Sequence, residues 1–245
     1  GQITSLMCGQ AYRMSALLAD IKGPYAGFAV NREPQLNVID MHRQEADALF
    51  ARATNAGVGD RVLQAASKLV WHEAMELARE YGVRNSQMTV LAPTGTIAFM
   101  MDCATTGIEP ELALIKYKKL VGGGMLKLVN SQVENALSHL GYTSMQVREI
   151  ADYLMQEETI EGAPHVRAEH LPVFDCSFKA TKGTRTISYM GHLRMMAAAQ
   201  PFISGAISKT INLPNDATRD DIADAFMQAM TLFGGNKIKS SAQYR

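Results

Sequence analysis

The sequence lacks the features that mark several large classes of protein. Its 24 Lys and Arg residues balance 24 Asp and Glu residues, so it has no basic excess with which to bind nucleic acid or an anionic membrane surface. No apolar run is long enough to span a bilayer, and the start does not resemble a signal peptide. We therefore expect a globular chain whose partners are neither nucleic acid nor a membrane.

Cysteine is also scarce. Cys8, Cys103 and Cys176 are widely spaced and form no C-x-x-C pair, which excludes a disulfide framework and a structural zinc site. His165 and His170 precede Cys176, but their spacing matches no compact ligand pattern, so we predict no metal site from these residues. A reducing, cytoplasmic location fits such thiols best.

What the chain does have is helical periodicity, over enough length to bury a core. Apolar spacing, capping residues and glycine stops predict helices over 8–21, 35–53, 60–80, 125–140, 143–157, 188–199 and 218–233. The expected caps are Asp60, with Gly82 past the end of that helix, a capping box of Thr143 with Gln146, Ser188, and Thr218 with Asp221. We expect the next-to-last helix to fill a core with Met190, Met195 and Met196, and the last to bury an apolar face of Ile222, Phe226, Ala229, Met230 and Phe233. Apolar runs at 88–92 and 205–213 predict short strands. Helices alternating with few strands favour an α/β fold with parallel strands.

The stretch from residue 88 to residue 100 carries the most chemistry. Its strand ends at Pro93, which has no N–H to donate, and a helix is expected to start just beyond. Gly95 permits close backbone approach, and Thr94 and Thr96 offer hydroxyl groups. Backbone N–H groups at such a helix start suit a phosphate. The alternative is an ordinary connection between a strand and a helix; it is not a P-loop, because the second Gly and the Lys are missing.

A second polar connection follows at residues 102–110, where Glu109 precedes Pro110 and is held extended. Beyond it, a basic cluster adjoins the glycine triplet at residues 122–124, and the cluster consists of Lys116, Lys118 and Lys119. Lysines beside a glycine run could hold another anion. The other interpretation is a mobile loop before the next helix.

Several stretches together resemble one family, the adenosylcobalamin-dependent (class II) ribonucleotide reductases. They are Leu-Ala-Pro-Thr-Gly-Thr-Ile-Ala-Phe-Met-Met-Asp-Cys at 91–103, Thr-Thr-Gly-Ile-Glu-Pro at 105–110, Lys-Tyr-Lys-Lys-Leu-Val-Gly-Gly-Gly at 116–124, and Gln-Pro-Phe-Ile-Ser-Gly-Ala-Ile-Ser-Lys-Thr at 200–210. The similarity runs from about residue 11 to residue 233. It implies the C-terminal part of the large catalytic chain, whose fold is a ten-stranded α/β barrel. Residues 1–233 would belong to the barrel, and residues 234–245 form an atypical tail that suggests a truncated piece.

The resemblance also implies an activity, the reduction of ribonucleotides, most simply diphosphates, to 2′-deoxyribonucleotides for DNA synthesis. In that family a cysteine thiyl radical, generated with adenosylcobalamin, removes the 3′-hydrogen, and a cysteine pair supplies electrons that a thioredoxin-type reductant restores. The family's substrate phosphates bind the loop that matches Pro93, Thr94, Gly95, Thr96 and Ile97.

One departure limits what this chain would do by itself. The family's radical cysteine lies in an Asn-x-Cys-x-Glu motif, and this sequence contains no such motif. We therefore assign no catalytic residue here and expect chemistry to need an N-terminal half carrying the catalytic cysteines. Cys103 and Cys176 are expected to be buried small hydrophobic residues. The alternatives are a non-catalytic nucleotide-phosphate-binding subunit of a split reductase, and an enzyme that uses Cys103 with Glu109, for which no His follows closely enough to act as base.

Overall fold

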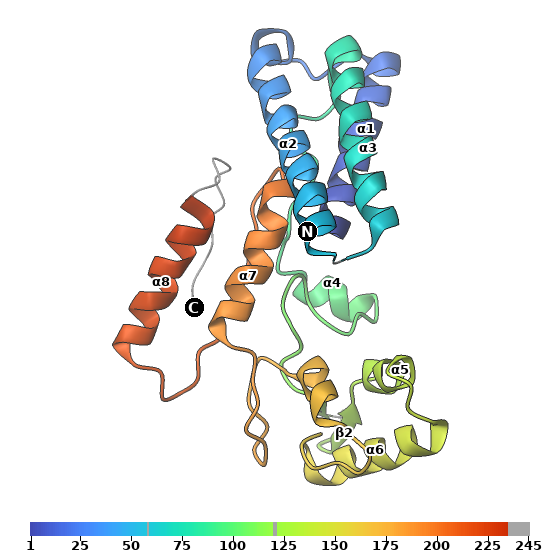
Figure 1. Cartoon of the computed structure of the whole chain (residues 1–245), viewed down its shortest axis with the longest axis vertical. Coiled ribbons are helices and arrows are strands. Elements are labelled where there is room, and N and C mark those ends of the chain that lie inside the picture. The colour runs from blue at the N-terminus through green and yellow to red at the C-terminus, as the bar shows by residue number, and fades with distance from the viewer. Residues whose placement is uncertain (58, 120–121, 235–245) are drawn as a thin grey trace. The chain divides into compact units, whose positions relative to one another are not determined.

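The computed structural model describes residues 1–57, 59–119 and 122–234, which divide into two compact units (Figure 1). The first unit comprises residues 1–92, 194–209 and 229–234, and the second comprises residues 93–193 and 210–228. The predicted atypical tail lies outside the described residues except for Gly234, which ends a helix. Within the described ranges, no helix has both the length and the apolar character that a bilayer span requires.

The first unit is built on three long helices, α1 (Gln2–Lys22), α2 (Arg32–Ala56) and α3 (Arg61–Tyr81), with short 3₁₀ turns at η1 (Ala29–Asn31) and η3 (Gln200–Phe202). All three helices were predicted. The helices α1 and α2 extend beyond their predicted ranges, and α3 agrees with its range to within one residue at each end. The ends of α3 confirm the reason given for them. The Asp60 carboxylate accepts the N–H groups of Val62 and Leu63, and Gly82 follows the last turn.

Aromatic rings fill the centre of this α1–α3 cluster. Trp71 of α3 lies fully buried between Tyr12 of α1 and His42 of α2, with ring centroids 5.7 and 5.0 Å away. Its indole N–H donates to the Ser5 carbonyl at 3.0 Å. A buried indole needs such an acceptor, because an unpaired N–H in a core costs the full desolvation penalty. The cluster is therefore a sealed interior whose polar groups are paired.

The two predicted strands meet as a short parallel pairing inside the first unit. Leu91 and Ile207 form an isolated parallel bridge, in which the Leu91 N–H donates to the Ala206 carbonyl at 3.0 Å and the Ser208 N–H donates to the Leu91 carbonyl at 2.8 Å. The parallel direction agrees with the prediction. The described residues do not extend this pairing into a larger parallel sheet, so the ten-stranded barrel stays an expectation from the family.

The second unit contains the remaining elements. They are α4 (Gly95–Met100), β1 (Ile115–Lys119), β2 (Met125–Val129), α5 (Gln132–His139), α6 (Ser144–Glu157) and η2 (Ala168–Phe174), together with most of α8 (Arg219–Gly234) and the start of α7 (Tyr189–Ala199). A small core of buried apolar residues joins β1, α5, α6 and η2, and it includes Ile115, Val133, Leu137, Ile150, Leu154 and Phe174. The predicted capping box of α6 is confirmed, between Thr143 and Gln146.

The helix predicted over 125–140 is wrong in its first half. Met125–Val129 is a strand, β2, paired antiparallel with β1 in the register Ile115 to Val129. Only Gln132–His139 is helical. The short apolar run Met-Leu-Lys-Leu-Val also suits a strand, and Gly122 and Gly123, with φ of 106° and 100°, let the chain turn back. The predicted mobile loop is thus a hairpin, although residues 120–121 lie outside the described residues.

In α7 and α8, the predicted capping residues are confirmed, but the side chains that are buried differ from those predicted. Ser188 accepts the Met190 N–H at the start of α7, and the Thr218 and Asp221 side chains cap α8. Of the methionines expected as core filler in α7, Met196 is buried whereas Met195 is exposed. The expected apolar face of α8 is confirmed only in part: Ala229 is buried, whereas Ile222, Phe226 and Met230 are exposed, and Ala225 is buried in their place.

Candidate functional site

The predicted anion site is an exposed loop, residues 93–97, which begins the second unit directly after the parallel pairing of the first. Pro93 ends the extended stretch, and α4 starts at Gly95. Pro93, Gly95, Thr96 and Ile97 are all solvent-exposed, and Thr94 is half-buried. Solvent can therefore reach the whole 93–97 loop.

The backbone amides of this loop are its main chemical resource. The Ala98 N–H donates to the Thr94 carbonyl at 3.1 Å and closes the first turn of α4. Within the described residues, the N–H groups of Gly95, Thr96 and Ile97 donate no hydrogen bond. Helix geometry explains this, because the first N–H groups of a helix have no carbonyl one turn earlier. Three adjacent donors thus face solvent at the positive end of a helix.

The backbone strain of the loop lies one residue earlier than the sequence suggested. Thr94 has φ of 48°, in the left-handed region, whereas Gly95 does not require a positive φ. A Cβ added to Gly95 would meet nothing within 4 Å. Gly95 therefore does not serve the turn itself, and the missing side chain leaves open space in front of the amides, where a ligand could approach the backbone closely.

A cavity of about 500 Å³ lies in the same unit, lined by residues 103–106, 109–113 and 115–117 together with Thr210 and Asn212. Residues 93–97 are not among its lining residues. Glu109, singled out from the sequence, fastens one wall, because its carboxylate accepts the Thr210 N–H at 2.6 Å. Glu109 thereby ties the 102–110 connection to the segment that follows the parallel pairing.

Lys116 is the one lysine of the predicted basic cluster whose side chain the structure describes. It pairs with Glu111 at 2.8 Å and donates to the Ala104 carbonyl at 2.9 Å. The second anion site therefore stays a prediction. The side chains of Lys118 and Lys119 lie outside the described residues.

The three cysteines differ in burial. Cys8 and Cys176 are buried, and burial raises the pKa of the Cys8 thiol to about 11 and that of the Cys176 thiol to about 12, so both are protonated and unreactive at neutral pH. The expectation that Cys103 is buried is wrong: it is exposed and lines the 500 Å³ cavity beside Glu109. None of the described residues lining that cavity is a histidine. The arrangement thus offers no obvious base for a Cys103 nucleophile.

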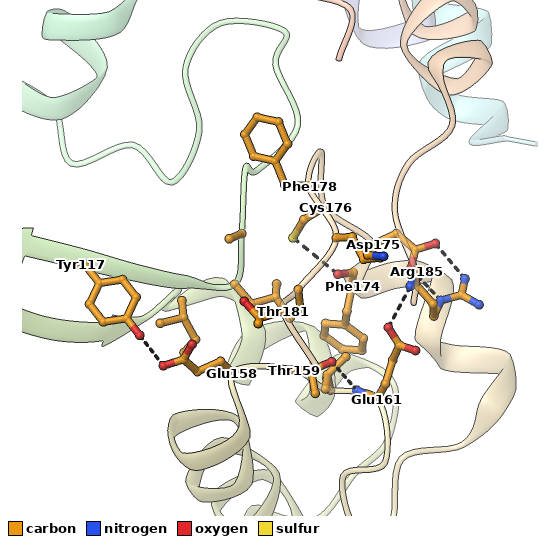
Figure 2. A pocket seen from close by; sticks show the side chains of 16 residues that line it. Tyr117, Glu158, Thr159, Glu161, Phe174, Asp175, Cys176, Phe178, Thr181 and Arg185 are labelled. Carbon is orange, nitrogen blue, oxygen red and sulfur yellow. Dashed lines mark hydrogen bonds and ion pairs between the residues drawn. The ribbon is translucent and has the colours of Figure 1, made fainter. Parts of the chain in front are cut away.

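A second cavity, of about 280 Å³, lies between the hairpin, the end of α6 and η2 (Figure 2). Its polar lining groups are engaged with one another: Arg185 holds Asp175 through two bonds of 2.7 Å, and Glu161 accepts the N–H groups of Thr184 and Arg185. This cavity was not predicted, because it depends on the pairing of β1 with β2. With their hydrogen bonds satisfied, these groups hold the local fold together.

The histidines near Cys176 do not gather around it. His165 pairs with Glu149, and the His170 ring nitrogen lies 2.8 Å from the Tyr142 hydroxyl. In the part of the chain that the structure describes, no group of three or more His, Cys, Asp or Glu side chains is arranged to hold a metal ion. These histidines therefore serve local packing.

Comparison with known proteins gives a consistent result. The family described as ribonucleotide reductase, barrel domain, matches residues 1–235. A vitamin B12-dependent ribonucleotide reductase from Rhodopirellula baltica is 49% identical over 245 residues, which cover 100% of this chain and 23% of the relative. The proteins of that name from Streptomyces coelicolor and Streptantibioticus cattleyicolor are each 46% identical over 100% of this chain, covering 24% and 39% of their own lengths. The chain thus spans between about a quarter and two fifths of these relatives.

Proposed function

This chain belongs to the family of the ribonucleotide reductase barrel domain, and on that premise we propose that its 93–97 loop binds the phosphates of a ribonucleotide substrate. The observation that carries the proposal is the row of N–H groups at Gly95, Thr96 and Ile97, which are solvent-exposed and donate to no other described group. The hydroxyls of Thr94 and Thr96 would add two further donors. The loop that matches these five residues has this role in the reductases that the sequence resembles.

The physical basis of binding is charge-assisted hydrogen bonding. A phosphate oxygen accepting a backbone N–H forms a stronger bond than a neutral acceptor does, and each such bond contributes roughly 1.5–3 kcal/mol. The open space in front of Gly95 lets phosphate oxygens come within hydrogen-bonding distance of the amides. The loop would hold the nucleotide by its phosphates and so fix where its ribose lies.

The reaction we propose for the assembled enzyme is reduction of the ribose 2′-carbon. The 2′-hydroxyl leaves as water, hydrogen takes its place, and two thiols become a disulfide that a thioredoxin-type reductant reduces again. No described cysteine of this chain is suited to those steps, because Cys8 and Cys176 are buried, and the described residues that line the cavity of Cys103 include no second cysteine to form a disulfide with it. The radical and redox cysteines would come from an N-terminal half of the reductase.

The cofactor we propose for the assembled enzyme is adenosylcobalamin, since the relatives are named vitamin B12-dependent. When bound, it supplies the radical that starts the reaction. The corrin ring of this cofactor holds its own cobalt, so the metal-ligand side chains of the described residues, which form no group of three or more, do not indicate where it would bind. We therefore assign no residue of this chain to the cofactor and derive no step through it.

Calorimetric titration tests this function. The chain is mixed with the complementary part of the Rhodopirellula baltica reductase and titrated with a ribonucleoside diphosphate and with the parent nucleoside. We expect the diphosphate to bind more tightly, and Gly95→Ala to weaken its binding by about tenfold or more, because the added methyl group blocks the amides. Gly27→Ala is the matched control, since its Cβ would make ordinary contact with Tyr25 at 3.4 Å.

Two results would overturn the phosphate site: equal affinity for nucleoside and diphosphate, or a Gly95→Ala variant that binds like the wild type. Chromatographic detection of deoxynucleotide, with adenosylcobalamin and a dithiol reductant present, then separates the two forms of the proposal. Product formation supports a catalytic part of the reductase. Tight diphosphate binding without product supports the non-catalytic subunit of a split reductase.

A further inference from the structure

Helix α1 distributes its side chains in an unusual way. The face that packs into the α1–α3 cluster carries mostly small residues: Ser5, Cys8, Gly9, Tyr12, Ser15, Ala16 and Ala19. The opposite face carries large apolar side chains whose exposed fractions are 64% for Ile3, 66% for Met7, 52% for Met14, 41% for Leu18 and 73% for Ile21. We call these five residues the α1 outer stripe. Large apolar side chains are normally the ones that are buried, so this face calls for a partner.

The spacing of the stripe indicates what kind of surface would cover it. Met7, Met14 and Ile21 recur every seven residues, which places them along one line of the helix. Ile3 and Leu18 lie beside that line, on either side. A two-helix coiled coil has a narrow seam of two positions per heptad, whereas a helix that faces a globular core has a wider stripe of three. The α1 outer stripe uses three heptad positions, those of Met7, Ile3 and Leu18, although no heptad fills all three with a large exposed side chain.

The charges around the stripe point the same way. The positions that lie within it between the apolar residues are Gln10 and Ala11, so no charged side chain interrupts it. Arg13, on the flank toward α3, is already paired with Glu73 at 2.6 Å. Helices that pair with a second copy usually carry complementary charges beside the seam to set partner and direction. Beside this stripe such charges are few, since Arg13 is already paired within the chain and Asp20 and Lys22 lie at its C-terminal end, which suits burial inside a fold.

We propose that α1 is an internal helix of the reductase, and that its outer stripe docks against an apolar helix or strand face from the reductase polypeptide outside these 245 residues. The Rhodopirellula baltica relative, of which this chain covers 23%, has ample polypeptide to supply that face. The partner's identity rests on the proposed function, because it is the remainder of the same enzyme. The stripe would be the seam along which the two parts of the reductase join.

The test is binding between this chain and the complementary part of the Rhodopirellula baltica reductase, measured by calorimetry without nucleotide or cofactor. The double variant Met7→Lys/Met14→Lys places two charges in the stripe, and we expect about 100-fold weaker binding or more. The matched control is Met145→Lys on α6, a methionine of similar exposure, 69%, which we expect to bind like the wild type. Both sites are exposed in the chain alone, so circular dichroism melting should show that the variants fold normally.

Three outcomes would overturn the proposal. The wild-type chain could fail to bind the complementary part, or the double variant could bind as tightly as the wild type. In sedimentation velocity, the chain alone could form a dimer that the double variant abolishes, which would give the stripe to a second copy. Binding to the complementary part can fail separately from diphosphate binding. If the diphosphate does not bind but the two parts of the reductase do, only the phosphate site is overturned. If the diphosphate binds but Met7→Lys/Met14→Lys does not weaken binding between the two parts, only the docking proposal is overturned.

Discussion

The α1–α3 cluster and the 93–97 loop treat their polar groups in opposite ways. In the cluster, the Trp71 indole N–H donates to Ser5, and the His42 Nδ1–H donates to the Pro201 carbonyl at 2.6 Å. In the loop, three consecutive amides are exposed and donate to no described partner. The N–H donors of the α1–α3 cluster are paired with acceptors inside the protein, whereas the backbone N–H donors of the 93–97 loop are exposed to solvent.

This difference separates stability from binding. A paired polar group in a sealed core contributes to the free energy of unfolding, because removing its partner leaves it desolvated. An exposed donor contributes little to folding, because water already satisfies it, and it remains available to a ligand. Changes in the cluster should therefore cost stability, whereas changes in the loop should cost binding alone. The predictions below test that separation.

The largest effect is expected from Trp71→Ala. The indole is fully buried and stacks on His42, so its removal leaves a cavity and takes the N–H partner from Ser5. We expect the free energy of unfolding to fall by about 3–5 kcal/mol, measured by urea denaturation with circular dichroism detection. Ile97→Ala, at an exposed position of the loop, is the control and should change it by less than about 0.5 kcal/mol. A similar decrease in the free energy of unfolding for both variants would contradict the proposed separation of stability from binding.

Two glycines sharpen the comparison with one methyl group each. A Cβ on Gly9 of α1 would lie 2.6 Å from Val70 Cγ1 and 3.1 Å from Trp71 Nε1, whereas a Cβ on Gly95 would meet nothing within 4 Å. We expect Gly9→Ala to reduce the free energy of unfolding by about 1–3 kcal/mol through overpacking. Gly95→Ala should leave it within about 0.5 kcal/mol of the wild type and still weaken diphosphate binding. If Gly9→Ala were the more stable protein, the cluster would be looser than its distances indicate.

The third prediction concerns pH. Burial lowers the pKa of His42 below its ordinary value of 6.5, although the bond to the Pro201 carbonyl acts in the opposite direction. As pH falls below about 6.5, the unfolded chain takes up a proton at His42 before the folded chain does, so the free energy of unfolding decreases. The decrease should continue until pH reaches the lowered pKa of the folded state. Urea titrations between pH 8 and about 5 should show it, and His42→Gln should remove this part of the slope. An unchanged slope in that variant would show that His42 is not the group responsible.

The smallest effect compares two threonine hydroxyls. Thr143 caps α6, where its hydroxyl accepts the Gln146 N–H at 3.3 Å, whereas Thr96 makes no hydrogen bond to a described residue. Thr143→Ala should cost about 1 kcal/mol of stability and leave diphosphate binding unchanged. Thr96→Ala should do the reverse. Thermal unfolding followed at 222 nm, with calorimetric titration beside it, checks both.

Features that depend on neighbouring residues could be predicted from the sequence. The limits of α3 follow from Asp60 and Gly82, and the α6 capping box follows from Thr143 and Gln146, because each rests on contacts within one helical turn. The 93–97 loop was located for the same reason. The left-handed conformation of Thr94 was not predicted, because glycine is the usual occupant of that conformation and Gly95 is the next residue.

Features set by distant partners could not be predicted. Met125–Val129 fits a helical stripe as well as a strand, and its pairing with Ile115–Lys119 decided between them. In α8, packing buries Ala225 and Ala229 instead of the larger residues Phe226 and Met230. Local periodicity shows that a face is apolar, but the surrounding fold determines which face is covered.

The parallel bridge between Leu91 and Ile207, just before the 93–97 loop, has a consequence for the order in which parts of the chain can fold during synthesis. The Met88 N–H donates to the Ser204 hydroxyl at 2.8 Å, across 116 residues of sequence, and the Leu91 N–H reaches Ala206. During translation, the segment that anchors the loop's entry leaves the ribosome long after the loop itself. A nascent chain can thus form α1, α2 and α3 early, but the segment that leads into the 93–97 loop gains its hydrogen-bond partners only once residues 204–208 have emerged.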